Sequence, residues 1–167
     1  AKVEATPYWE ELRHKAHAVK RDVMDHLDEY LLKFEEHAQA NDIHIHWAVD
    51  TKEAQQIIHK IATENGVQTV VKSKSLTTEE IHLNKFLIDH NIETLETDLG
   101  EYIIQLAGET PSHIIAPAIH KTRHDVGRLF ADHLEIPYED DPPKLTWIAR
   151  KALRQKFLAA DMGTSGC

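Results

Sequence analysis

The residues best suited to chemistry lie in three polar turns between residues 69 and 123, and each turn follows an apolar segment. The first turn combines lysines with serines, the second holds three carboxylates, and the third holds a histidine and two cations: Lys72, Ser73, Lys74 and Ser75; Glu96, Asp98 and Glu101; His120, Lys121 and Arg123. In an open parallel sheet, turns at the carboxyl ends of the strands line the ligand crevice. We therefore predict that the three turns converge on one charged pocket.

The first turn predicts a site for a small carboxylate or phosphate. Residues 72–75 stand between a predicted strand and a predicted helix start, where free amides, ammonium groups and hydroxyls together favour an anion. A solvated loop whose serines cap the backbone is the competing interpretation. The predicted ligand-binding residues are Lys72, Ser73, Lys74, Ser75, Asp98, His120 and Lys121.

The second and third turns supply the catalytic candidates, which are Glu96, Glu101 and His120. The glutamates are suited to act as general bases, to bind a cation, or to pair with the lysines of the first turn, and His120 is suited to shuttle a proton. Structural roles compete with these. We favour helix capping for Asp98, Glu101 suits the first turn of the same helix through the macrodipole, and His120 fits a surface loop.

Signals for metals and cofactors are weak. His44 and His46 share one face of a predicted strand, but no convincing third ligand accompanies them, so we predict no metal site. The sequence has no serine nucleophile elbow, Walker loop, dinucleotide-binding glycine fingerprint or cysteine pair. We expect no cofactor in this chain.

Composition and charge narrow the class of protein. The 167 residues are 41% hydrophobic, which is enough to bury a core, and the net charge of −9 argues against a nucleic-acid partner. Cys167 is the one cysteine and cannot form an internal disulfide. No apolar run is long enough to span a bilayer, and the first residues do not resemble a signal peptide. We predict a cytoplasmic protein without a membrane span.

The first 41 residues form a segment of their own. Apolar residues recur every three or four positions from Trp9 to about Ala40, which predicts one long amphipathic helix. Its narrow stripe fits packing against a neighbour, including a second copy of the chain in a homo-oligomer. A helix that lies across its own domain explains the stripe equally well.

Residues 42–167 alternate strand and helix patterns. Strands are predicted at 43–49, 67–71, 92–97 and 113–117, and helices from Asp50 to Gly66, from Thr77 to near Asn91, and at 99–107, 121–134 and 145–160. This order predicts an α/β domain with a mostly parallel sheet covered on both faces. Four strands are few for so many helices, and residues 161–167 form a turn of the sort that launches another strand. Both features fit the front portion of a larger domain.

Several uncommon strings follow one another along the chain, at residues 9–11, 71–75, 78–81, 96–103, 111–121 and 154–163. In sequence and order they closely resemble the LUD domain family, in particular the iron–sulfur-associated subunits of the bacterial L-lactate utilisation system. The resemblance implies a three-layer α/β/α fold similar to ribose-phosphate isomerases and CoA transferases. It also implies a role, with sister subunits, in oxidising lactate to pyruvate.

The resemblance further implies iron–sulfur clusters, which full-length family members hold on clustered cysteines in their C-terminal region. One thiolate cannot hold a cluster that needs four. Our leading hypothesis is therefore an accessory module of a lactate-oxidising electron-transfer complex, which docks sister subunits and holds a small anion. The alternatives are a small-molecule-binding enzyme domain of the isomerase or CoA-transferase type, with catalysis by Glu96, Glu101 and Lys72, and an inert structural fragment.

Overall fold

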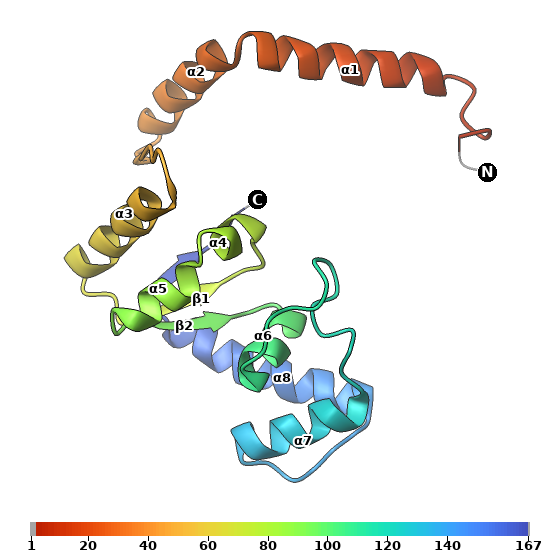
Figure 1. Cartoon of the computed structure of the whole chain (residues 1–167), viewed down its shortest axis with the longest axis vertical. Helices are drawn as coiled ribbons and strands as arrows, with labels where there is room; N and C mark the ends of the chain where they lie inside the picture. The colour runs from red at the N-terminus through yellow and green to blue at the C-terminus, as the bar shows by residue number, and fades with distance from the viewer. Residues whose placement is uncertain (1–2, 167) are drawn as a thin grey trace. The chain divides into compact units, whose positions relative to one another are not determined.

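A computed structural model describes residues 3–166 of the chain (Figure 1). The chain divides into two compact units, residues 1–47 and residues 48–167. No helix among the described residues is both long and apolar enough to cross a membrane.

The N-terminal unit contains two helices, α1 (Trp9–Asp25) and α2 (Leu27–Gln39), so the prediction of one continuous helix is wrong. His26 separates the two helices, because its backbone angles of φ −127° and ψ 32° lie outside the helical range. Both the backbone amide and the ring Nδ1 of His26 lie within hydrogen-bond distance of the carbonyl oxygen of Asp22, at 3.1 and 2.9 Å. The Tyr30 hydroxyl donates to the Asp22 carboxylate at 2.7 Å and links the two helices across the break.

The predicted strand at residues 43–49 is also wrong. These residues pair with no strand among those that the structure describes, and Val49 is 92% exposed. An alternation of apolar and polar residues forms a strand only where a neighbouring strand takes up its backbone hydrogen bonds. His44 and His46 lie in this extended segment, and no group of three potential metal ligands occurs among the described residues.

The second unit is an α/β domain with three layers. Its elements are α3 (Thr51–Glu64), β1 (Thr69–Lys72), α4 (Leu76–Glu80), α5 (Leu83–Asp89), β2 (Glu93–Glu96), α6 (Leu99–Ala107), α7 (Arg123–Leu134), α8 (Pro142–Ala159) and β3 (Met162–Thr164). The strands form a parallel sheet in the order β2-β1-β3. The predicted fold class, a mostly parallel sheet between helical layers, is confirmed.

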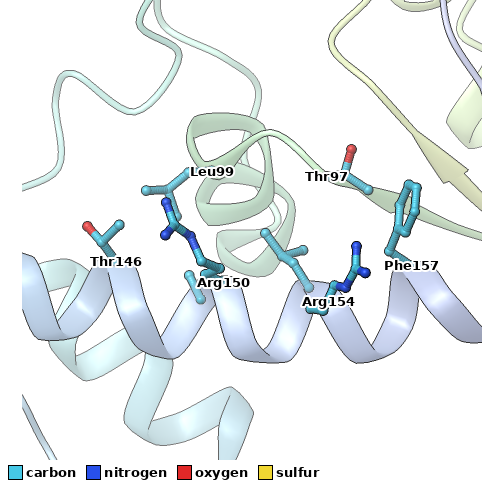
Figure 2. Close-up of a pocket in the computed structure, with 8 residues that line it drawn as sticks. Thr97, Leu99, Thr146, Arg150, Arg154 and Phe157 are labelled. Atoms are coloured by element: carbon cyan, nitrogen blue, oxygen red, sulfur yellow. The ribbon is translucent and has the colours of Figure 1, made fainter.

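Two apolar clusters cover the two faces of this sheet. Val70 of β1 packs with α3 and α5, whereas Leu95 of β2 packs with α6, α7 and α8. Leu95 is the register partner of Val71, and neighbouring residues of a strand point to opposite faces. α8 therefore lies on the face away from α5, where it runs alongside the turn from β2 into α6 (Figures 1 and 2).

The predicted helix from Thr77 to Asn91 is two helices. His82, between α4 and α5, has a left-handed backbone with φ 50°, which ends the first helix and redirects the chain. α4 begins before the predicted Thr77, because the Ser75 hydroxyl caps it by accepting from the amide of Thr78. The predicted ends of α3 and α6 are confirmed, and Gly66 and Gly108, which follow them, have a left-handed backbone.

The predicted buried strand at residues 113–117 is wrong. This segment forms bends, and Ile115 is 80% exposed. Local hydrogen bonds explain the difference: the His113 ring accepts from the amides of Ile115 and Ala116, and the backbone amide and hydroxyl of Ser112 both donate to the Pro117 carbonyl. Side chains that bond their own backbone compete with strand pairing.

Asp161 fixes the start of the sheet. Its carboxylate accepts from the amides of Gln68 and Thr69 and from the Thr69 hydroxyl, at 2.9–3.0 Å. These bonds hold the pKa of Asp161 below its usual value. They also tie the chain after α8 to the first residue of β1, so that β3 enters the sheet beside β1.

We predict that Asp161→Asn lowers Tm by about 2–6 °C at neutral pH, because an amide replaces the acceptor of three hydrogen bonds. The folded pKa of Asp161 is depressed, so its contribution is present above the unfolded value of 3.8 and is lost as pH falls through the folded value. The difference between variant and wild type should therefore shrink in acid. Calorimetry against pH measures it, with Asp132→Asn on the exposed surface of α7 as the control. Equal Tm values for Asp161→Asn and Asp132→Asn at pH 7 would contradict this role.

Candidate functional site

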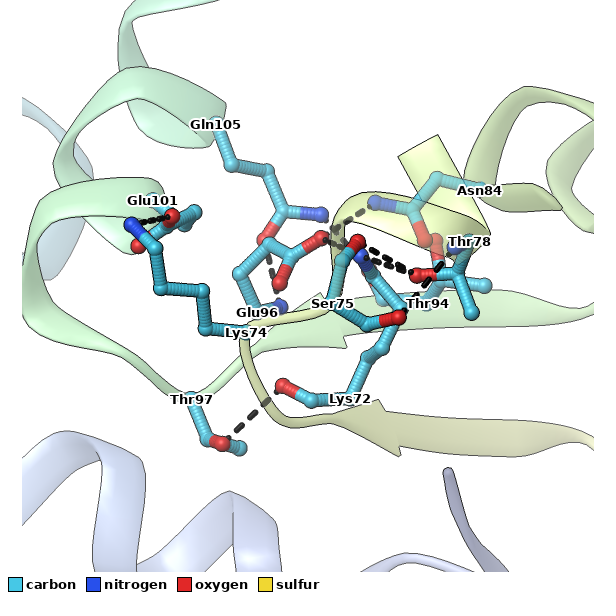
Figure 3. Close-up of polar contacts among 10 residues, drawn as sticks. All are labelled: Lys72, Lys74, Ser75, Thr78, Asn84, Thr94, Glu96, Thr97, Glu101 and Gln105. Atoms are coloured by element: carbon cyan, nitrogen blue, oxygen red, sulfur yellow. Dashed lines mark hydrogen bonds and ion pairs between the residues drawn. The ribbon is translucent and has the colours of Figure 1, made fainter. Parts of the chain in front are cut away.

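A buried ion pair joins the carboxyl ends of β1 and β2 (Figure 3). Lys72 and Glu96 are register partners, and the Lys72 Nζ lies 2.7 Å from Glu96 Oε1. The two residues are only 1% and 4% exposed. The Lys72 ammonium also donates to the Thr78 hydroxyl at 3.0 Å, and the Asn84 amide donates to Glu96 Oε1 at 2.6 Å. The ion pair is therefore held by strands and by both helices of the α4–α5 segment.

Side chains and backbone beyond the pair hold the end of β2 in place. The amide group of Gln105, on α6, accepts from the backbone N–H of Glu96 at 3.0 Å and donates to the Thr94 carbonyl at 2.8 Å. The backbone amide and the hydroxyl of Thr97 both donate to the carbonyl of Lys72. Sequence reasoning missed Gln105, Thr97 and Asn84. The one available signal was a glutamine in the otherwise apolar run of α6.

A second charged cluster lies beside the first. The Lys74 Nζ lies 2.5 Å from Glu101 Oε1, and Glu101 is 5% exposed. Asp98 caps α6 by accepting from the amide of Gly100 at 3.0 Å, as the sequence favoured. Burial raises the pKa of Glu101, and the hydrogen bond with Asp98 raises it further, against the lowering effect of Lys74.

The pKa values of Glu101 and Asp98 are shifted in opposite directions. The hydrogen bond with Glu101 lowers the pKa of Asp98, and the amides of the α6 N-terminus lower it further. Glu101 Oε2 has no donor partner among the described residues as long as both carboxyl groups are ionised. A carboxyl group whose pKa is raised by burial is suited to general acid–base chemistry.

An open pocket of about 570 Å³ gives access to both clusters. Its wall includes Asn84 of α5, Glu96 of β2, Glu101 of α6, and Glu109 beyond α6. Three acceptor atoms of this wall are buried and have no partner among the described residues, namely Asn84 Oδ1, Glu96 Oε2 and Glu101 Oε2. The wall therefore includes carboxyl and amide groups with an oxygen that no described residue uses.

The third turn reaches the pocket through Glu109. His120 Nε2 lies 2.8 Å from the Glu109 carboxylate, Lys121 pairs with the same carboxylate, and both lower the pKa of Glu109. His120 Nδ1 lies 2.8 Å from the Ser112 hydroxyl. Neither His120 nor Lys121 is part of the wall, and Arg123 is the exposed first residue of α7.

The residues of the first turn are already occupied within the protein. Both lysines pair with glutamates, the Ser73 amide donates to the Thr164 carbonyl, and Ser75 caps α4. Of the roles considered for Glu96 and Glu101, the structure contains the pairing with the lysines of the first turn. An anion at Lys72 or Lys74 would have to compete with a carboxylate only 2.7 or 2.5 Å away.

Removing one partner of the buried pair should be far more costly than removing both. We predict that Lys72→Met lowers the free energy of unfolding by about 3–5 kcal/mol, because it leaves Glu96 buried and unpaired. The double variant Lys72→Met/Glu96→Gln should regain a large part of that loss. Urea denaturation measures both, and Lys85→Met, at a lysine whose side chain is 80% exposed, should cost less than about 1 kcal/mol. If the double variant is no more stable than Lys72→Met, the pair is not the source of the loss.

Comparison with known proteins identifies one family and several curated relatives. The LUD domain family matches residues 31–167. Proteins called lactate utilization protein B from Bacillus cereus, Bacillus thuringiensis and Bacillus anthracis are each 40% identical to this chain over 159 residues. The matched region covers 95% of this chain and 34% of each of those proteins, so the chain spans about a third of the length of these curated relatives. No solved structure matches it.

The family match covers most of the chain and includes the whole parallel sheet with the Lys72–Glu96 pair. The chain belongs to the LUD domain family.

Proposed function

We propose that this chain acts in L-lactate utilisation, as the LUD-type part of a subunit of a complex that oxidises L-lactate to pyruvate. The observation that carries the proposal is 40% identity, over 95% of the chain, to proteins called lactate utilization protein B. Those relatives extend well beyond the matched region, which is 34% of their length. The electron-transfer chemistry of the complex then belongs to other parts of the assembly.

Within the complex, we assign this domain a role in assembly and ligand binding rather than in redox chemistry. Its one cysteine cannot supply the four thiolates of an iron–sulfur cluster, so clusters belong to the C-terminal region of full-length family members. The partners are sister subunits of the complex. The exposed apolar side chains of α1 and α2, among them Leu12, Val19 and Phe34, are available for contact with a sister subunit or a second copy.

The pocket beside the Lys72–Glu96 pair suits a small hydroxy acid better than a bare anion. A hydroxyl group can donate to Glu96 Oε2 or Glu101 Oε2, which are buried acceptors in need of a donor. The pocket wall also includes Lys85, which is the cation that a ligand carboxylate would meet. L-Lactate carries both groups, which supports a role for the pocket in lactate binding.

The alternative function is a small-molecule-binding enzyme domain of the isomerase or CoA-transferase type. The raised pKa of Glu101, at the wall of an open pocket, is the observation that favours it. Under this alternative, Glu101 donates and accepts a proton. Because burial raises the pKa of Glu101, turnover that needs its proton would fall as pH rises through that raised pKa.

Deleting the gene that encodes this chain, in its own host, tests the proposed function. We expect growth on L-lactate to be lost and growth on pyruvate to be retained, because pyruvate enters metabolism after the oxidation step. The wild-type gene should restore growth on lactate. Normal growth of the deletion strain on lactate would overturn the proposal.

A pocket variant in the same strain tests the site. We expect Glu101→Gln to slow growth on L-lactate at least about fivefold without reducing the amount of protein, because it removes a carboxylate from the pocket wall while its partner Lys74 keeps access to water. Glu80→Gln, which makes the same change at an exposed position of α4, should grow normally. Wild-type growth of Glu101→Gln would exclude this carboxylate from the function. Turnover of a small molecule by the purified chain, abolished by Glu101→Gln, would favour the alternative.

A further inference from the structure

α8 is a basic helix in an acidic protein. It carries five basic residues and no acidic residue, although the net charge of the chain is −9. Two of the lysines are neutralised locally, since Lys144 pairs with Glu139 and Lys156 lies 3.6 Å from Glu93. The positive charge of α8 is therefore concentrated on its middle turns.

Arg150 and Arg154 stand on one face of α8, one turn apart. Both extend from the helix toward the turn that carries Thr97 and Leu99 (Figure 2). Together these four residues line a hollow of about 410 Å³ between α8 and the start of α6. Neither arginine takes part in an ion pair or side-chain hydrogen bond with any residue from 3 to 166.

The rest of the hollow contributes no competing donor. The Thr97 hydroxyl donates to the carbonyl of Lys72, and the Thr146 hydroxyl donates to the carbonyl of Pro142, so neither hydrogen is left for a ligand. The two guanidinium groups are thus the side-chain donors that face the hollow. A planar guanidinium fork matches the oxygens of a carboxylate or a phosphate.

The remaining wall of the hollow is apolar. Leu99, Leu153 and Phe157 line it, and Phe157 is 51% exposed, so part of its ring is available to a ligand. Burying this surface would favour a ligand that has a hydrocarbon or aromatic part in addition to its charge. A bare inorganic anion would leave the apolar wall in water.

We propose that the groove between α8 and the β2–α6 turn is a binding site for an organic anion. Arg150 and Arg154 bind its carboxylate or phosphate group, and Leu99, Leu153 and Phe157 contact its apolar part. No residue that lines this groove lines the acidic pocket at Glu96 and Glu101, so this is a second site. Thr97 connects the two regions, because it lines the groove and bonds the carbonyl of Lys72. The inference does not depend on the role in lactate utilisation.

Calorimetric titration of the purified chain tests the groove with four probes: octanoate, phenyl phosphate, inorganic phosphate and the uncharged 1-octanol. We expect octanoate or phenyl phosphate to bind at least about tenfold more tightly than both inorganic phosphate and 1-octanol. Inorganic phosphate lacks the apolar part, and 1-octanol lacks the charge. Which of the two organic anions binds better identifies carboxylate or phosphate as the preferred group. Failure of both organic anions to bind at millimolar concentration would overturn the proposal.

Variants locate the binding. Arg150→Gln and Arg154→Gln should each weaken binding of the organic anion about tenfold without a change in Tm, since both side chains are exposed. Arg154→Lys should bind with intermediate affinity, because it keeps the charge and loses the fork. Arg123→Gln, an equal loss of charge on α7, and Glu101→Gln in the acidic pocket should bind like the wild type. Unchanged affinity in both Arg150→Gln and Arg154→Gln would place the anion elsewhere and exclude this groove.

Discussion

The ion pair between Lys72 and Glu96 is the constraint on which the rest of the candidate site depends. It lies where two neighbouring parallel strands end, and removing two charges from water is tolerated only when each charge has close partners. Thr78 and Asn84 from the α4–α5 segment supply those partners, while Gln105 and Thr97 hold the strand ends from α6 and its turn. The pair thereby fixes the position of both helical segments that wall the acidic pocket.

Much of the α/β arrangement could be predicted because its signals are local. α6 illustrates this, since Asp98 caps it, Gly108 ends it in the left-handed conformation, and its apolar residues Tyr102, Ile103 and Ile104 are buried. The predictions of strands at 43–49 and 113–117 were wrong because a strand needs a neighbouring strand, and the local sequence pattern does not specify that neighbour. At residues 113–117, the side chains of Ser112 and His113 form hydrogen bonds with the nearby backbone, which takes the place of pairing in a sheet. β3 was predicted only as a turn. It is three residues long, which is too short to show the alternation of apolar and polar residues that identifies a strand in a sequence.

The candidate site was predictable in location but not in chemistry. Residues at the carboxyl ends of β1 and β2 were expected to converge, and Lys72 and Glu96 do. Their spacing along the chain could not show that each lysine of the first turn pairs with one glutamate of the second. Because of this pairing, the pocket is acidic and rich in hydrogen-bond acceptors, whereas a positively charged site for an anion was predicted. Asn84 and the two arginines of α8 had no sequence signal, because their importance arises only from the surfaces that face them.

Acetylation of lysines in the native protein, read by mass spectrometry, tests the central claim most directly. Lys72 is 1% exposed and pairs with Glu96, whereas the side chains of Lys74 and Lys85 are 32% and 80% exposed. The account predicts that Lys85 reacts fastest, Lys74 more slowly, and Lys72 only after the protein is unfolded in urea. Acetylation of Lys72 in the folded protein at the rate of Lys85 would show that its ammonium group is in water, and would contradict the account.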